Sequence, residues 1–306
     1  MFLTGFADEA DPALAGQIEV TRELGWKYIE MRNVSGKMLG TMSDAEFAAV
    51  EEALAAAGLS VNCYGSGIAN WACHPRSDAD FEKSRNELLT AIPRLHKLGV
   101  KMVRGMSFKV PEDEPEGSEG LEKVAFGKVR ELVKICADNG LVYGHENCQN
   151  IGGMSWKHTL RLLEAVDSPA LTLIFDTGNP CFNYRRLGPR PWPLQSSWEF
   201  YRQVRDHVSY VHIKDSTAIP REDCMPVTEN KYQWPGEGNG DIRAIMKDLL
   251  ARGYDGGFSM EPHLGAIFHD PKAGDDDAAK IVARHKMYVE YGRRFTQLLR
   301  DCGWKC

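Results

Sequence analysis

The stretch Leu171–Asn179 reads LTLIFDTGN, an apolar run that ends in an aspartate and a glycine turn. Similar runs recur along the chain, and each is short enough for a strand buried on both faces of a parallel sheet. Polar turns and amphipathic stretches separate them, which predicts strands alternating with helices throughout. Eight runs have this form: Phe2–Ala7, Lys27–Met31, Leu59–Tyr64, Lys101–Met106, Leu141–Glu146, Leu171–Asp176, Ser209–Ile213 and Gly257–Glu261.

The stretches between these runs have helical periodicity. Between Ile281 and Leu299, the residues of one stripe recur at spacings of three and four. A second stripe follows Ser43, which forms with Glu46 the S-x-x-E pattern of a capping box. Gly58 marks the expected C-terminal end of that helix, because glycine readily takes the left-handed conformation found there.

Eight strand–helix units without a Ser/Gly-rich linker predict a single-domain (β/α)₈ TIM barrel that covers residues 1–306. A length of 306 residues with 43% hydrophobic residues suits one such domain with a substantial core. A doubly wound open sheet is the main alternative, although that fold rarely runs to eight units in one domain.

Three connections are long enough to have functions of their own. Pro111–Gly120 is acidic and rich in proline and glycine, which indicates a solvated segment. Thr177–Ser197 and Ser216–Gly240 carry several aromatic residues and arginines, a composition that favours ordered walls over a pocket. We therefore count Arg185, in the first of these two, among the candidate substrate-binding residues.

The bulk composition narrows the classes of function. A formal net charge of −6 argues against a partner bound through phosphate neutralisation, so we expect no nucleic-acid partner. No apolar run approaches the ~18 residues that cross a bilayer, and the N-terminal sequence MFLTGFADEADP carries acids where a secretory signal carries positive charge. These features predict a cytoplasmic protein with no membrane partner, in which the eight cysteines, without any C-x-x-C pair, stay reduced.

Polar residues end four successive strands of the predicted barrel. These are Glu146 in GHEN, Asp176 in FDTGN, His212 in VHIKD and Glu261 in SMEP. Since the carboxyl ends of barrel strands share one rim, the four side chains should meet there. Three like charges would be costly to bury together without a cation, so the pattern predicts one divalent metal ion bound by all four.

The predicted ligand set also limits the choice of metal. Three carboxylates and one imidazole, without a thiolate, suit Mn²⁺, Mg²⁺ or Co²⁺, and Zn²⁺ stays open. We favour Mn²⁺.

These motifs, together with ADE at 7–9 and PGEGNGDI at 235–242, resemble the xylose isomerase-like TIM barrel superfamily, which includes the AP endonuclease family 2-type barrels. The resemblance covers nearly the whole chain. Its members include ketose 3-epimerases, hydroxypyruvate isomerases, inosose dehydratases and endonuclease IV. The order Glu, Asp, His, Glu is specific for the superfamily and not for one reaction.

The resemblance implies that Glu146 and Glu261 both bind the metal and move protons, as the corresponding residues do in the epimerases. A metal that chelates a carbonyl and its neighbouring hydroxyl acidifies the C–H bond between them and stabilises a metal-bound enediolate. One carboxylate then removes the proton and the other returns it on the opposite face. Asn179 departs from the family, since many epimerases and endonuclease IV have a histidine there; this weakens both of those assignments.

Several further residues are candidates for substrate contact. Lys214 lies two residues after His212 and should share its direction, so it either enters the pocket or pairs with Asp215. His263 has the same relation to Glu261, although a solvated loop histidine is slightly favoured.

Two strand residues have open roles. Arg104 could bind substrate, although an ion pair with Glu30 inside the barrel is slightly favoured. His145 should point outward as a packed or supporting residue, because its neighbour Glu146 points inward.

The glycines at 236, 238 and 240 could bind a phosphate through their amides. Glu237 among them would repel it, so we expect a structural turn and a non-phosphorylated substrate.

The sequence therefore predicts a metal-dependent isomerase or epimerase acting on a small carbohydrate, a ketose or keto-sugar acid. A lyase or dehydratase could use the same enediolate on a keto-sugar, an inosose or a 3-keto-glycoside. A non-catalytic sugar-binding barrel and an endonuclease IV-like enzyme are remoter alternatives. The resemblance is compatible with a homo-oligomer.

Overall fold

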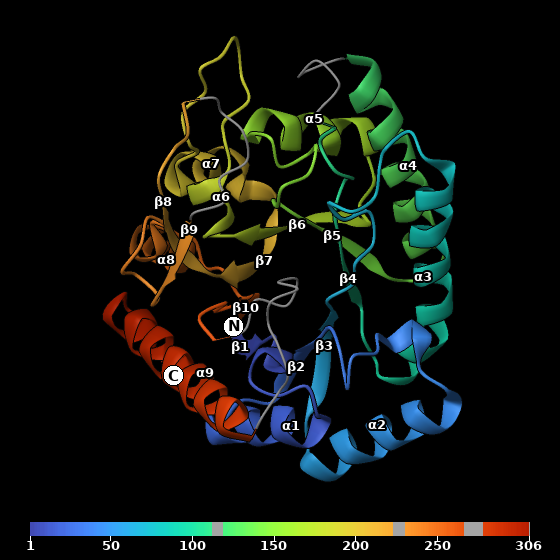
Figure 1. Cartoon of the computed structure of the whole chain (residues 1–306), viewed down its shortest axis with the longest axis vertical. Coiled ribbons are helices and arrows are strands. Elements are labelled where there is room, and N and C mark those ends of the chain that lie inside the picture. Colours follow the sequence, from blue (N-terminus) through green and yellow to red (C-terminus); the bar gives the residue numbers. More distant parts are fainter. Residues whose placement is uncertain (112–118, 223–229, 266–277, 306) are drawn as a thin grey trace.

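The computed structural model describes residues 1–111, 119–222, 230–265 and 278–305. Eight strands form one parallel sheet in the order β1-β10-β7-β6-β5-β4-β3-β2. β1 and β2, at the two ends of this order, lie against each other, so the sheet curls into a nearly closed barrel (Figure 1). The strands are β1 (Phe2–Gly5), β2 (Tyr28–Met31), β3 (Ser60–Tyr64), β4 (Met102–Gly105), β5 (Val142–Glu146), β6 (Leu171–Asp176), β7 (Val208–Ile213) and β10 (Gly257–Met260).

Helices surround the strands on the outside of the barrel (Figure 1). The fold is thus a single-domain (β/α)₈ TIM barrel, and the predicted fold class and all eight predicted strands are confirmed. That the domain takes in the whole of residues 1–306 stays a prediction. The helices are α1 (Leu14–Glu23), α2 (Asp44–Ala57), α3 (Asp78–Lys97), α4 (Glu119–Asp138), α5 (Trp156–Val166), α6 (Asn179–Phe182), α7 (Ser197–Val204), α8 (Ile242–Ala251) and α9 (Ala278–Asp301), with short 3₁₀ turns at Ala7–Glu9, Leu39–Thr41 and Arg205–His207.

The predicted start and end of α2 are both present. The Ser43 hydroxyl accepts a hydrogen bond from the amide of Glu46, whose carboxylate accepts one from the amide of Ser43. Gly58 ends the helix in the left-handed conformation with φ of +66°. The local sequence therefore sets both ends of this helix, as the capping box and glycine stop predict.

Alternation along the strands divides the protein into two packed regions. Outward residues such as Val103, Leu173 and Phe175 join the main core between sheet and helices. Inward residues that precede those of the candidate site along their strands form a small apolar cluster of Cys63, Ile174 and Tyr210, against which Phe2 and Met102 pack. The next inward positions along the same strands carry the polar residues of the site, because side chains two apart share a face.

Two of the long connections contain secondary structure that the sequence analysis did not predict. Thr177–Ser197 includes the short α6 and an isolated bridge between Tyr184 and Leu194. Ser216–Gly240 includes most of an antiparallel hairpin of β8 (Asp215–Ala218) and β9 (Asn230–Gln233). Both segments are thus ordered where they are described. The stretch expected to be solvated, Pro111–Gly120, falls mainly at 112–118, outside the described residues.

The glycine-rich turn before α8 binds a carboxylate of the protein itself. Amides of Gly236, Gly238 and Gly240 donate to Asp215 at 2.8, 3.0 and 2.8 Å. A Cβ on Gly238 would lie 2.3 Å from Asp215 Oδ1, so the close approach requires glycine there. The expectation of a structural turn is met in the described geometry, with Asp215 in the place an external anion would take.

In the described part of the chain, no helix has the length and apolar character needed to cross a bilayer.

Candidate active site and metal centre

Four side chains from adjacent strands meet at one end of the barrel. Glu146 ends β5, Asp176 ends β6, His212 lies in β7 and Glu261 directly follows β10. One potential ligand atom from each lies within 4.8 Å of the others, and all four residues are buried. Far-apart stretches of sequence thus form a single group that could hold a metal ion.

The donor atoms of this group fit a divalent cation. Among the described residues, Asp176 Oδ2, His212 Nδ1 and Glu261 Oε2 are buried and form no hydrogen bond, and the two carboxylate oxygens both lie within 3.1 Å of the Lys214 ammonium. One ammonium does not neutralise all the carboxylates of the cluster, so the three converging atoms could also bind a divalent cation. Oxygen and imidazole donors without a thiolate suit Mn²⁺, Mg²⁺ or Co²⁺, with Zn²⁺ also compatible.

Glu30 on β2 orients the histidine of the group. The carboxylate of Glu30 lies 3.1 Å from His212 Nε2 and accepts a hydrogen bond from the Tyr210 hydroxyl at 2.9 Å. With Nε2 bound in this way, Nδ1 points to the carboxylates, 3.5 Å from Glu146 Oε1 and 3.9 Å from Glu261 Oε2. A carboxylate behind a ligating histidine is a common arrangement in metal sites, where it fixes the ring and raises its basicity.

The charges of this cluster outweigh the effect of burial on its pKa values. Burial alone would lower the pKa of His212, but the neighbouring carboxylates Glu30 and Glu146 raise it to about 10. Burial alone would raise the pKa of Glu146, yet Arg104 and His212 lower it to about 2. Without a bound metal, His212 is therefore an imidazolium and Glu146 a carboxylate at neutral pH, and a metal that binds Nδ1 displaces a proton.

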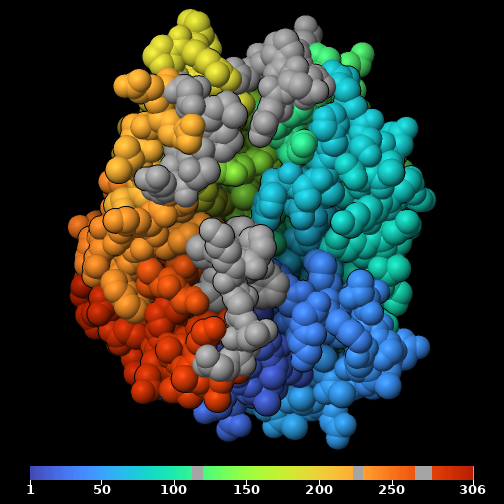
Figure 2. Space-filling view, viewed as in Figure 1, coloured from blue at the N-terminus to red at the C-terminus, as the bar shows by residue number. Residues whose placement is uncertain are grey.

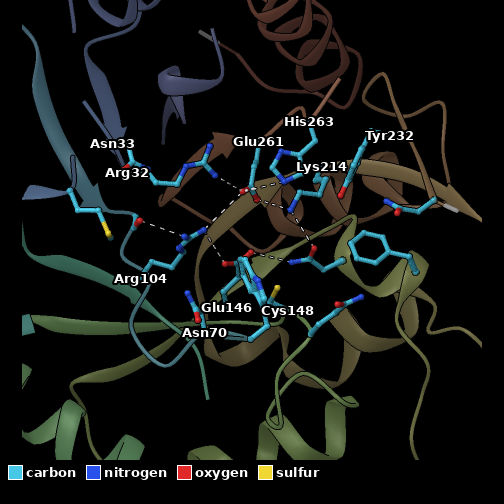
Figure 3. Close-up of a pocket in the computed structure, with 18 residues that line it drawn as sticks. Arg32, Asn33, Asn70, Arg104, Glu146, Cys148, Lys214, Tyr232, Glu261 and His263 are labelled. Carbon is cyan, nitrogen blue, oxygen red and sulfur yellow. Dashed lines mark hydrogen bonds and ion pairs between the residues drawn. The ribbon is translucent and has the colours of Figure 1, made fainter. Parts of the chain in front are cut away.

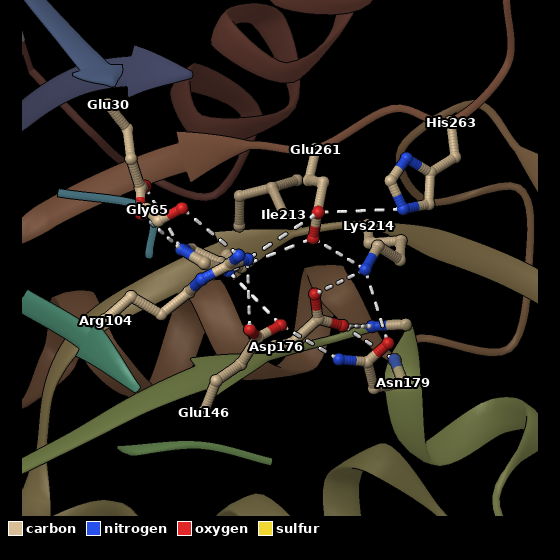
Figure 4. Close-up of polar contacts among 12 residues, drawn as sticks. Glu30, Gly65, Arg104, Glu146, Asp176, Asn179, Ile213, Lys214, Glu261 and His263 are labelled. Carbon is tan, nitrogen blue, oxygen red and sulfur yellow. Dashed lines mark hydrogen bonds and ion pairs between the residues drawn. The ribbon is translucent and has the colours of Figure 1, made fainter. Parts of the chain in front are cut away.

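Lys214 enters the site and does not pair with Asp215, which the glycine turn already binds. Its Nζ atom lies 2.6 Å from Glu261 Oε2, 3.1 Å from Asp176 Oδ2 and 3.3 Å from Asn179 Oδ1 (Figure 4). Burial would lower the pKa of Lys214, but the charges of Asp176 and Glu261 raise it well above its ordinary value. The ammonium group is thus a permanent charge beside two candidate metal ligands.

Asn179 connects three members of the site. Its side-chain nitrogen donates to Glu146 Oε1 at 3.1 Å, and its oxygen accepts from Lys214. Its backbone amide and that of Gly178 donate to Asp176 Oδ1 at 2.6 and 2.8 Å. These two amides hold one oxygen of Asp176 and leave the other directed to the cluster.

The sequence analysis favoured the wrong partner for Arg104. Its guanidinium donates to Glu146 Oε2 at 3.3 Å and to the backbone carbonyl of Ser66 at 3.0 Å. Glu30 instead pairs with His212. In place of an Arg104–Glu30 ion pair, the barrel contains the pairs Arg104–Glu146 and Glu30–His212. Each of them includes one candidate metal ligand.

His263 is buried, so the favoured expectation of a solvated loop histidine is wrong. Only 4% of its surface is exposed. Its Nδ1 atom lies 2.8 Å from Glu9 Oε1, and its Nε2 atom lies 3.6 Å from Glu261 Oε1. The Tyr232 ring meets the imidazole edge-on at 4.9 Å between centroids. Glu9 also accepts the backbone amide of His263 at 2.8 Å, which anchors this residue at a φ of +53°.

Arg185 lies away from the candidate ligands. Its guanidinium forms an ion pair with Glu199 at 2.9 Å, and both side chains are partly exposed. It is not among the residues that line the cavity over the cluster. Its placement gives it no part in the function proposed below.

Arg32 is a site residue that the sequence analysis missed. Its guanidinium donates to both oxygens of Asp8, at 2.9 and 3.0 Å, and lies 3.1 Å from Glu261 Oε1. Glu9, Glu261 and His263 could also hold a metal by distance alone, but Arg32 lies 3.4 Å from Glu9 and thus already supplies positive charge there. Alternation could have found Arg32, since it lies two residues beyond the inward Glu30.

A cavity of about 350 Å³ opens over the cluster. Figure 3 shows Arg104, Glu146, Lys214, Glu261 and His263 around it, contributed by strands on different sides of the barrel. In the space-filling view of this face, the blue and cyan segments of the chain lie on the right and the orange and red segments on the left (Figure 2). A cavity of this size suits a small polar ligand.

The buried charges around this cavity do not balance. Among the described residues, six buried carboxylates face four buried cations, so a metal ion would reduce the remaining repulsion. The carboxylates are those of Asp8, Glu9, Glu30, Glu146, Asp176 and Glu261, and the cations are Arg32, Arg104, Lys214 and the His212 imidazolium.

A family model described as xylose isomerase-like TIM barrel matches residues 18–284. The chain therefore belongs to the xylose isomerase-like TIM barrel family. This finding confirms the resemblance drawn from the strand-end motifs.

Two curated relatives are inosose dehydratases. The protein from Bacillus licheniformis is 22% identical over 61% of this chain and 62% of its own length, so the match leaves more than a third of that relative uncovered. The protein from Geobacillus thermodenitrificans is 20% identical over 87% of this chain and 90% of its own length.

Two solved structures have the same fold as this chain. A xylose isomerase-like TIM barrel protein from Mycobacterium smegmatis, in complex with magnesium, has a TM-score of 0.63 at 20% identity, with 97% of each chain covered. A D-psicose 3-epimerase solved in the presence of D-fructose has a TM-score of 0.67 at 16% identity, with 98% of this chain and 99% of that chain covered. At these identities the likeness establishes the fold alone.

Proposed function

We propose that this protein is a metal-dependent isomerase or epimerase that acts on a ketose or a related keto-sugar. The observation that carries the proposal is the convergence of Glu146, Asp176, His212 and Glu261, whose potential ligand atoms lie within 4.8 Å of one another. An epimerase among the structural relatives is consistent with it. One divalent ion, with Mn²⁺ favoured, would be held by these four residues.

The bound ion would supply Lewis acidity, which lowers the pKa of the C–H bond between a carbonyl and a hydroxyl carbon. Glu146 and Glu261 are the proposed proton-transfer groups. They reach the centre from β5 and from the end of β10, on opposite sides of the cluster in Figure 4. One carboxylate removes the proton; the other takes up a proton from water and delivers it to the opposite face, which inverts that carbon, and the first then releases its proton to water.

The surrounding residues keep these two carboxylates ionised and oriented. Burial would raise the pKa of Glu261, but Lys214 and His263 lower it well below its ordinary value. Arg104 has the corresponding effect on Glu146. Arg104, Lys214, Asn179 and His263 all line the cavity, where we propose that they bind substrate hydroxyl and carbonyl oxygens.

The test is exchange of a substrate proton with solvent. Protein loaded with Mn²⁺ in D₂O should introduce deuterium next to the carbonyl of a ketose such as D-psicose or D-fructose, followed by NMR. Glu146→Gln and Glu261→Gln should each reduce the rate by roughly 10²–10⁴-fold, the usual contribution of a positioned acid or base. Glu82→Gln, an exposed carboxylate on α3, is the control and should exchange at the unaltered rate.

Exchange that is absent for every ketose, keto-acid and inosose offered would contradict the proposal. Equal rates for the two glutamine variants and the control would also contradict it, because proton transfer would then not depend on either carboxylate.

A dehydratase is the second candidate, favoured by the position of Lys214. After the same proton is removed, loss of a β-hydroxyl needs a proton donor for the leaving oxygen, and Lys214 presents a buried ammonium beside Glu261 in the cavity. Two inosose dehydratases among the relatives also support this reaction. An unsaturated product from an inosose, detected by mass spectrometry as a loss of water, would distinguish dehydration from epimerisation.

A further inference from the structure

A second cavity of about 240 Å³ adjoins the one over the candidate metal centre. Four residues line both of them, which makes the two cavities neighbouring compartments with a shared wall. These are Trp71, Cys148, Gln149 and Phe182. The second compartment is lined by none of the four candidate metal ligands, so it is not a part of the metal centre.

The chemistry of the second compartment differs from that of the first. Lys109 and Arg186 line it, and no described residue that lines it is acidic. Arg186 already has other contacts, so only the charge of Lys109 is counted as available to a ligand. Among the described residues, Lys109 forms no ion pair that would neutralise its ammonium group. The Arg186 guanidinium lies 5.4 Å from the centre of the Trp192 ring. The compartment therefore favours a ligand group with negative charge.

Backbone contacts place both cationic residues at fixed points of this wall. The amide of Lys109 donates to the carbonyl of Cys73 at 2.9 Å, and the amide of Arg186 donates to the carbonyl of Met154 at 3.0 Å. Each cationic side chain thus extends from backbone that is hydrogen-bonded to a buried residue. Less conformational entropy is therefore lost when a ligand binds.

Flat and apolar side chains form much of the remaining wall. Trp71 and Phe182 stand at the boundary between the compartments, and Tyr184, Val110 and Met154 line the second one. Aromatic faces of this kind stack on planar rings and on the apolar faces of sugars. The combination of ring-stacking surface and positive charge matches a ring with an anionic substituent.

The first compartment alone is large enough for a small ligand. We propose that the substrate has two parts: a keto-sugar unit over the metal centre and a second ring with an anionic end in the adjoining compartment, facing Lys109. This inference rests on the proposed function for the sugar unit. It extends that function by assigning the substrate to the glycosides or ring-substituted sugars, not the free monosaccharides.

Calorimetry with unreactive glycosides tests the second compartment without any turnover. The probes are 4-carboxyphenyl β-D-glucopyranoside, methyl β-D-glucopyranoside and benzoate, each titrated into the Mn²⁺-loaded protein. The carboxyphenyl glycoside should bind at least roughly tenfold more tightly than the methyl glycoside, as expected for one hydrogen bond to a charged group plus ring contact.

Lys109→Met should remove roughly tenfold of the affinity for the carboxyphenyl glycoside and leave that for the methyl glycoside unchanged. Val110→Trp should fill part of the compartment and have the same selective effect. Lys134→Met, on the exposed surface of α4, is the matched control and should bind both glycosides as the original protein does.

Equal affinities of the two glycosides for the unaltered protein would overturn the inference, as would equal weakening of both by Lys109→Met. Benzoate that binds as tightly as the carboxyphenyl glycoside, without competing with the methyl glycoside, would show a separate anion site and would also overturn it. Because these probes lack a ketone, their binding is independent of proton exchange. Failure of the proposed reaction and failure of this inference are therefore distinguishable.

Discussion

Two buried histidines, one on the inner and one on the outer face of the barrel wall, have pKa values shifted in opposite directions. His212 faces inward among carboxylates, and Glu30 and Glu146 overcome the effect of burial to raise its pKa to about 10. His145 faces outward, bonded to Ser107 and Asn150, and burial lowers its pKa to about 4. Both are fully buried, so burial does not distinguish them. The neighbouring groups make the difference: His212 lies among carboxylates that could share a metal ion with it, whereas His145 is hydrogen-bonded to neutral side chains.

The inner face is itself divided along the strands. Ile174 and Asp176 lie two residues apart on β6, the first in the small apolar cluster and the second among the candidate ligands. On β6, Ile174 thus contributes to the stability of the fold, and the next inward residue, Asp176, contributes to the candidate metal site. The following predictions are arranged by expected effect, from the largest to the smallest, and each would either break this division or sharpen it.

Ile174→Ala should lower the free energy of unfolding by about 2–5 kcal/mol, because it empties space in a fully buried cluster. Its Mn²⁺ affinity should stay close to that of the unaltered protein. Asp176→Asn should show the reverse, with metal binding strongly weakened and a much smaller change in unfolding. Urea denaturation and metal titration of both variants measure the two quantities; loss of metal binding in Ile174→Ala with unchanged stability would break the division.

Glu30→Gln should weaken Mn²⁺ binding roughly 10–100-fold, the usual effect of losing the group behind a ligating histidine. Tyr210→Phe removes the hydroxyl that donates to Glu30 but leaves the Glu30–His212 contact, so it should have a smaller effect. The comparison is made by competition with a fluorescent metal chelator. If Glu30→Gln binds Mn²⁺ as well as the unaltered protein does, the interpretation of Glu30 is wrong.

The buried His158, in helix α5 outside the barrel, should make the folded protein less stable in acid. Burial lowers its pKa to about 4, whereas the unfolded chain binds a proton near 6.5. The unfolded state therefore gains protons first, and stability falls as pH drops from 6.5 towards 4, by about 2 kcal/mol between pH 7 and pH 5. Urea unfolding at a series of pH values should show a shallower decline for His158→Gln. An identical pH dependence for the two proteins would refute this assignment.

Ser43→Ala should have the smallest effect, a loss of about 1 kcal/mol from removal of the capping hydroxyl of α2. The helix lies outside the barrel wall, so metal affinity and proton exchange should not change. Thermal unfolding together with the exchange assay checks both statements, and reduced exchange in this variant would show coupling between the helix layer and the site.

Local patterns in the sequence were sufficient to predict the strands and the capped helix. The apolar runs of β1 to β7 and β10, and the Ser43–Glu46–Gly58 signals of α2, act between residues that are close along the chain. The four candidate ligands were also accessible, because the barrel fold by itself brings the ends of neighbouring strands together.

Partner choice inside the barrel was less accessible from the sequence. Arg104 could have bound either Glu30 or Glu146, and only the closed sheet determines which carboxylate is within reach. The burial of His263 depends on Glu9, more than 250 residues earlier, which lies 2.8 Å from a ring nitrogen and accepts a hydrogen bond from the backbone amide. Such contacts follow from tertiary packing and leave no periodic signal in the sequence.

The central claim is most directly tested by titrating metal-stripped protein with Mn²⁺ in a calorimeter, alongside the double variant Asp176→Ala, His212→Ala. The account predicts one ion bound per chain by the unaltered protein and none by the double variant. No binding to the unaltered protein, or undiminished binding by the variant, would contradict it.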